Sequence, residues 1–209
     1  MKKRICRSLA LLLAVLTVCG PLGAMAAQTA QQDGTWYIED YTDDFGDPTG
    51  DHFMSCELKG TYSTPTAINR EFTVNTAFGL NAQHFVFTLY KCSNNQYQAV
   101  NDYFSFEDIT IRFEIDNEIY EYPILNRGVD KQNIYLNNDY ERQAAEDRGM
   151  PVRQSGECGY DKLYEQLLRG SDVQTVLLIG STKYSFVIPA GNFEMTAAEA
   201  FESERGRAI

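Results

Sequence analysis

The chain has 209 residues, enough for one domain with a sizeable core, and its formal net charge is −11. A negative field of this size repels nucleic acid and anionic membranes, so both are excluded as partners. Cationic partners, calcium or a simply solvated acidic surface remain open.

Residues 1–26 have the pattern of a secretory signal peptide. Four Lys and Arg residues precede a short apolar run from Leu9 to Val18, and Ala24-Met25-Ala26 fits a cleavage site. The apolar run is too short for a membrane span. We expect a single mature domain, residues 27–209, which is periplasmic, extracellular or envelope-associated. Loss of the four basic residues would change the net charge from −11 to −15. Lipidation of Cys19 is the alternative.

The stretch from Asp40 to Asp51 is dense in turn-forming residues. Gly46 and Gly50 accept positive φ, Pro48 fixes its own φ, and Asp side chains bond back to nearby backbone. We expect a structural turn, with Phe45 anchoring it to a core.

The same stretch offers oxygen ligands for calcium, namely Asp43, Asp44, Asp47 and Asp51. The EF-hand spacing fails, because placing either glycine at the turn position puts Tyr41 or Phe45 where the first Asp belongs. A structural turn formed by Phe45, Gly46, Pro48 and Gly50 is therefore favoured, with calcium as the alternative and no other cofactor.

Strand patterns occupy most of the chain up to residue 125. They cover residues 36–39, 52–58, 71–78, 84–91, 109–115 and 119–125. The clearest places Ile109, Ile111, Phe113 and Ile115 on one face, and Asp116-Asn117 makes a hairpin turn. Residues 61–70 are expected to be turn-rich. Residues 127–156 are expected to be irregular, with a strand at 134–136 and a helical turn near 141–147.

Helical signals come late in the chain. Residues 161–169 have one apolar face, with Asp161 as the cap and Gly170 at the end. Strands follow at 173–179 and 183–188, and Thr196 to Glu199 is a capping box that opens a second helix. These elements predict a mainly β fold, an antiparallel β-sandwich or barrel with one or two short helices near the C-terminus.

Three cysteines remain after loss of the signal, so at most one intramolecular bridge forms. Strand parity puts Cys56 on a core face and Cys92 away from one. We expect a Cys92–Cys158 disulfide, with Cys56 as a buried free thiol.

A resemblance to a known family rests on Trp36, the run Asp43–Asp51 and the run Gly60–Asn69. They resemble the Asp-x-Phe-Gly-Asp-Pro-Thr-Gly opening of an uncharacterised domain of exported bacterial proteins and lipoproteins. The tail from Cys158 to Phe201 is faintly similar to the invasion-associated locus B family of periplasmic proteins. The resemblance implies an exported bacterial β-domain and no catalytic residue.

Motifs for catalysis are missing from the sequence. His52 and His84 are the two histidines, each within a strand pattern, and no serine-hydrolase, zinc-protease, Walker or dinucleotide motif occurs. We expect a non-enzymatic module that binds a protein, peptide or envelope component. Two alternatives stay open: a secreted hydrolase using loop carboxylates beneath a lid at 127–156, and a calcium-stabilised structural domain.

Overall fold

The structure is a computed structural model that describes residues 33–79, 84–93, 96–99, 109–124 and 133–205. The chain divides into two compact units, Met1–Gln31 and Gln32–Ile209, and the description below concerns the second. The predicted signal peptide at 1–26 and the expected start at Ala27 lie outside the described residues.

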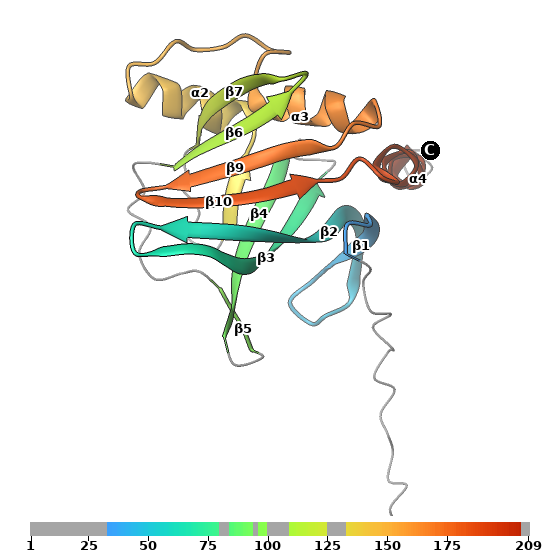
Figure 1. The fold of residues 1–209 in the computed structure, drawn as a ribbon. Coiled ribbons are helices and arrows are strands. Elements are labelled where there is room, and N and C mark those ends of the chain that lie inside the picture. Colours follow the sequence, from blue (N-terminus) through green and yellow to red (C-terminus); the bar gives the residue numbers. More distant parts are fainter. Residues whose placement is uncertain (1–32, 80–83, 94–95, 100–108, 125–132, 206–209) are drawn as a thin grey trace, which may run out of the picture. The chain divides into compact units, whose positions relative to one another are not determined.

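One antiparallel sheet dominates the second unit and curls into a nearly closed barrel (Figure 1). Its strands are β1 (Tyr37–Thr42), β2 (Pro48–Thr64), β3 (Ala67–Gly79), β4 (His84–Ser93), β5 (Gln96–Ala99), β6 (Ile109–Ile115), β7 (Glu118–Ile124), β8 (Asn133–Leu136), β9 (Val173–Ile179) and β10 (Thr182–Ile188). The order is β5-β4-β3-β2-β10-β9-β6-β7, with β1 on β2 and β8 on β4. The predicted mainly β fold, an antiparallel sandwich or barrel, is confirmed, and the sheet is barrel-like.

Three helices lie in the described part of the chain: α2 (Asn138–Asp147), α3 (Gly159–Leu168) and α4 (Phe193–Arg205). Helix α2 packs on β7, α4 packs on β2, and α3 contacts both other helices. No helix among the described residues is long and apolar enough to cross a membrane.

Both predicted helix starts were wrong by a few residues. Helix α3 begins after Cys158, so Asp161 lies in its first turn, where the carboxylate accepts the Gly156 N–H at 2.8 Å. Helix α4 begins at Phe193, so Thr196 lies in its first turn, where the hydroxyl donates to the carbonyl of Asn192, the residue before the helix, at 2.9 Å. Core packing of Tyr160 and Phe193 extends each helix toward its N-terminus.

The core fills the inside of the curled sheet, and most of its largest fully buried side chains are aromatic. The four predicted residues of β6, Ile109, Ile111, Phe113 and Ile115, are all buried. The predicted inner residues of β4, Phe85, Phe87 and Leu89, are buried as well. The inward faces of these strands are therefore confirmed, and alternation alone was sufficient to predict them.

The turn at Asp116 and Asn117 has φ of 54° and 64°, as expected for a two-residue hairpin that needs left-handed backbone. The turn-rich segment predicted at 61–70 is wrong. Strand β2 continues to Thr64 and β3 begins at Ala67, so the turn is confined to Pro65 and Thr66. Pairing of Thr61 with Glu71 and stacking of Tyr62 on Tyr184 extend the strands.

The segment predicted as irregular is largely ordered structure where it is described. The strand expected at 134–136 is present as β8, and the expected helical turn is the ten-residue helix α2. The Asn137 side chain caps α2 by accepting the Tyr140 N–H at 2.7 Å. Residues 133–147 are thus packed against the barrel, which differs from the lid of the hydrolase hypothesis.

The thiols of Cys56 and Cys158 are both buried and free. The Cys158 side chain turns inward, 3% exposed, and donates to the Gln154 carbonyl at 3.5 Å. The predicted bridge from Cys158 to Cys92 is therefore not formed, and the side chain of Cys92 lies outside the described residues. Cys56 is a buried free thiol, as strand parity predicted.

Candidate functional site

The β1–β2 hairpin contains the predicted turn, and Asp43 organises it. The Asp43 carboxylate accepts the backbone N–H groups of Phe45 at 2.9 Å and of Asp47 at 3.0 Å. The Asp43 N–H donates to the Asp47 carbonyl at 2.9 Å. One carboxylate thus holds the whole five-residue turn, which is an Asx-type arrangement.

Glycine is required at the middle of this turn. Gly46 has φ of +87°, a left-handed conformation that residues with a Cβ rarely adopt, and its N–H donates to the Asp43 carbonyl at 3.0 Å. A Cβ at this position would meet no atom within 4 Å, so the constraint is conformational. Pro48 opens β2 opposite Thr42, and Gly50 also has positive φ.

The expectation that Phe45 anchors the turn to a core was wrong. Its side chain is 91% exposed. The turn is built by Asp43 rather than by apolar contact, so nothing draws the ring inward. Tyr41 supplies the aromatic contact further down the hairpin, where its ring centre lies 4.8 Å from that of Phe53.

The four candidate calcium ligands do not form a cluster. Within the described ranges, no group of three or more His, Cys, Asp or Glu residues is arranged to hold a metal ion. The Asp43 carboxylate is engaged by backbone, and Asp44, Asp47 and Asp51 are exposed. Asp40 instead lies 2.5 Å from Nδ1 of His52, a contact between β1 and β2.

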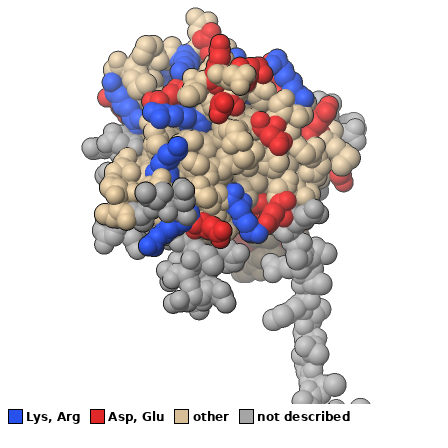
Figure 2. Space-filling model, in the orientation of Figure 1, with Lys and Arg blue, Asp and Glu red and all other residues tan. Residues whose placement is uncertain are grey.

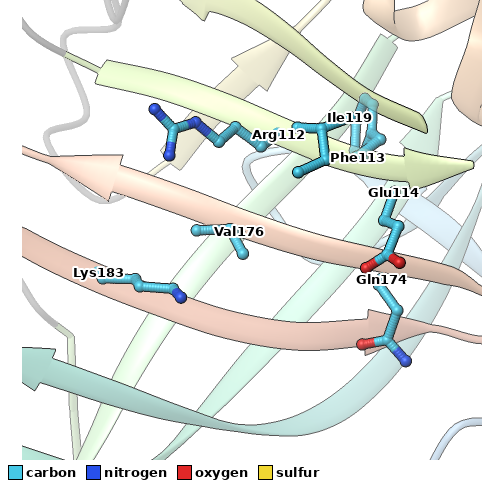
Figure 3. Close-up of a pocket in the computed structure, with 7 residues that line it drawn as sticks. All are labelled: Arg112, Phe113, Glu114, Ile119, Gln174, Val176 and Lys183. Atoms are coloured by element: carbon cyan, nitrogen blue, oxygen red, sulfur yellow. The ribbon is translucent and has the colours of Figure 1, made fainter. Parts of the chain in front are cut away.

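A second surface lies on the outer face of the sheet, across β6, β7, β9 and β10 (Figure 3). It is a hollow of about 260 Å³, called the outer-face pocket below. Its lining residues are Arg112, Phe113, Glu114, Ile119, Gln174, Val176 and Lys183. In Figure 2, largely uncharged side chains occupy the middle of the corresponding face.

Strand alternation and register bring the side chains of the outer-face pocket together. Arg112 pairs with Val176, and Glu114 pairs with Gln174, on the face opposite to the buried β6 residues. Alternation predicted outward side chains for Arg112 and Glu114. Gln174 and Lys183 were missed, because the sequence carries no signal that places β9 and β10 beside β6.

A buried carboxyl group, Glu141 of α2, is a further feature that sequence reasoning missed. It is 4% exposed and accepts the Gly159 N–H at 2.6 Å, while Nη1 of Arg153 lies 3.8 Å away. Burial raises the pKa of Glu141 to about 7, against the opposing effects of the Gly159 hydrogen bond and the Arg153 charge. The available signal was its spacing from Ala144 and Ala145, three and four residues later, which places all three residues on one helix face.

Gly159 makes this contact feasible. A Cβ there would stand 2.9 Å from the Tyr122 ring and 3.2 Å from the Glu141 carboxylate. The Arg153 guanidinium lies over the same ring, 4.1 Å from its centre. These contacts join α2, α3 and β7, and the Glu141 carboxylate between them is buried.

Comparisons of this chain with family models, with curated proteins and with solved structures gave no match. The resemblances drawn from the sequence motifs therefore stay predictions.

Proposed function

We propose that this chain is an exported, non-enzymatic binding module that docks on a partner protein through the β1–β2 hairpin. The observation that carries the proposal is Phe45, 91% exposed at the tip of a turn that Asp43 holds. Single exposed apolar residues are common. Here the exposed ring lies on a turn that the Asp43 hydrogen bonds hold in one conformation. Aromatic residues that become buried on binding contribute much of the binding free energy of many protein interfaces.

The charge around Phe45 specifies the partner. The hairpin between residues 39 and 51 contains no Lys or Arg, and its acidic residues are Glu39, Asp40, Asp43, Asp44, Asp47 and Asp51. A complementary partner offers an apolar pocket for one phenyl ring, surrounded by Lys and Arg side chains. Such charges accelerate association and make it sensitive to salt.

Two further observations support export and a non-enzymatic role. The first 26 residues have the composition of a signal peptide. The carboxyl group whose pKa is raised to about 7, Glu141, is enclosed by α2, α3 and β7. A carboxyl group in that position does not face a substrate, which supports a module over a hydrolase.

Photo-cross-linking in cells that export the full chain tests the proposal. With p-benzoylphenylalanine in place of Phe45, irradiation should give one major covalent adduct. The same group in place of Met195, which is 68% exposed on α4, should not give that adduct. Asp44→Asn and Asp47→Asn, which leave Asp43 intact, should lower the yield. No adduct at position 45, or identical adducts at both positions, would contradict the proposal.

A further inference from the structure

The outer-face pocket lies on β6, β7, β9 and β10, which are different strands from those of the β1–β2 hairpin. We propose that it binds a short free peptide of about three residues, the extended length estimated below from strand geometry. The peptide carboxylate lies at Lys183 and Arg112, and its amino group lies at Glu114 and Gln174. Figure 3 shows these two pairs at opposite ends of the pocket, with Val176 between them.

Two opposite charges in this pocket are available to a ligand. Within the part of the chain that the structure describes, neither Lys183 nor Glu114 has a side-chain ion pair or hydrogen bond, and both are exposed. Arg112 uses Nε for Glu121 at 2.6 Å, which leaves the two terminal amino groups of its guanidinium as donors. The pocket therefore offers cationic donors at one end and oxygen acceptors at the other.

The register sets the length of the ligand. Glu114 on β6 pairs with Gln174, and Lys183 on β10 pairs with Leu178, four residues further along β9. Standard strand spacing then separates the Cα atoms of Glu114 and Lys183 by about 16 Å. When each charged group stays near its own Cα position and contacts the ligand at about 3 Å, roughly 10 Å is left for the ligand, which is the span of three extended residues.

The floor and size of the pocket agree with a small ligand. Val176 is half-buried at the centre of the pocket, and Ile119 is 73% exposed at its edge. An apolar side chain at the middle residue of the peptide would therefore contact apolar groups. The volume of about 260 Å³ is just below that of typical pockets for drug-sized molecules.

A second copy of this chain is the other occupant that the charges allow, because Glu114 and Lys183 lie on opposite sides of Val176. In a two-fold symmetric pair, Glu114 of each copy would lie against Lys183 of the other copy. The hollow at Val176 would then face its own copy and leave a void, which close-packed interfaces avoid. The concave shape therefore favours a free peptide.

Isothermal titration calorimetry on the full chain tests this inference with two probes, the free tripeptide Ala-Leu-Ala and its acetylated, amidated form. The free peptide should bind at least about tenfold more tightly, because the blocked form lacks both end charges. Lys183→Gln and Glu114→Gln should each weaken binding of the free peptide roughly five- to tenfold. Lys162→Gln and Glu146→Gln, on α3 and α2, are the matched controls and should change nothing. Melting curves confirm that each variant folds.

Three results would overturn the inference. The first is equal affinity for the free and blocked peptides, or no binding of the free peptide up to roughly 10 mM. The second is undiminished affinity in both Lys183→Gln and Glu114→Gln. The third is a concentration-dependent dimer that Lys183→Glu abolishes and the double variant Glu114→Lys with Lys183→Glu restores, which would assign the face to a second copy.

Discussion

The β1–β2 and β6–β7 hairpins have similar turn residues, but the phenylalanine of the first is exposed and that of the second is buried. In both, Asp at the turn supports left-handed backbone, at Gly46 in one and at Asp116 and Asn117 in the other. Phe45 at the first turn is almost fully exposed, whereas Phe113, three residues before the second turn, is fully buried. The turn residues thus determine where the chain reverses, and the neighbouring strands determine which side chains are buried.

Neighbouring strands explain the difference. Strand β6 lies between β7 and β9 along most of its length, so one of its faces is the barrel interior. The tip of the β1–β2 hairpin pairs with neither β10 nor β3, which join β2 only from Phe53 onward. The β6–β7 hairpin therefore stabilises the fold, while the tip of the other is available to a partner.

The largest expected effect compares the two phenylalanines directly. Phe113→Ala should lower the free energy of unfolding by about 3–5 kcal/mol, because it leaves a cavity in the barrel. Phe45→Ala should change it by less than about 0.5 kcal/mol, because the ring is already in water. Denaturant unfolding of both variants measures the difference, and similar losses would remove the contrast between the hairpins.

Arg112→Ala is the internal control for β6. Its side chain points to the outer face beside Phe113, so the free energy of unfolding should hardly change beyond loss of an exposed ion pair with Glu121. A loss as large as that of Phe113→Ala would mean that the strand register is wrong.

The next effect concerns charge beneath β7. The pKa of Glu141 is raised by burial to about 7 in the fold, above its ordinary value near 4.5. The folded state then binds more protons than the unfolded state between these values. The contribution of Glu141 to stability is fully present below pH 4.5 and is lost as pH rises through 7, a decrease of about 3 kcal/mol.

Glu141→Gln should remove this decrease, because the amide cannot ionise. Urea unfolding of wild type and variant at intervals from pH 4.5 to 8 gives the difference in slope. Asp44→Asn, an exposed carboxylate of the β1–β2 hairpin, is the control and should leave the slope of wild type. Parallel curves for Glu141→Gln and wild type would show that this carboxyl group is not buried as described.

A smaller effect is expected at the tip of the β1–β2 hairpin. Gly46→Val should lower the free energy of unfolding by about 1–2 kcal/mol, because a β-branched residue is strained at φ of +87°. Gly46→Ala and Gly46→Asn should cost progressively less, since Asn tolerates this conformation best. An unchanged stability in Gly46→Val, measured by denaturant unfolding, would show that the turn adopts another conformation.

Local sequence patterns predicted the features that depend on neighbouring residues alone, namely the buried faces of strands and the positions of turns. Alternation identified the inner faces of β4 and β6, and turn chemistry identified the reversals at Gly46 and at Asp116. Long-range pairing was not predictable, so the outer-face pocket, which needs β9 and β10 beside β6, remained hidden. The apolar character of Phe45 does not predict its exposure, because the turn is held by hydrogen bonds to Asp43 and needs no apolar contact.

The smallest effect expected is that of calcium on the β1–β2 hairpin. A ligand that binds the folded state must raise the melting temperature by mass action. A calcium site needs about six or more oxygen ligands converging on one point. Here the Asp43 carboxylate already accepts two backbone N–H groups. Millimolar calcium should therefore shift the melting temperature by less than about 1 °C, as scanning calorimetry with calcium and with chelator would measure. A large rise that disappears in Asp43→Asn or Asp47→Asn would instead make the hairpin a metal site and remove its acidic face from the proposed partner interface.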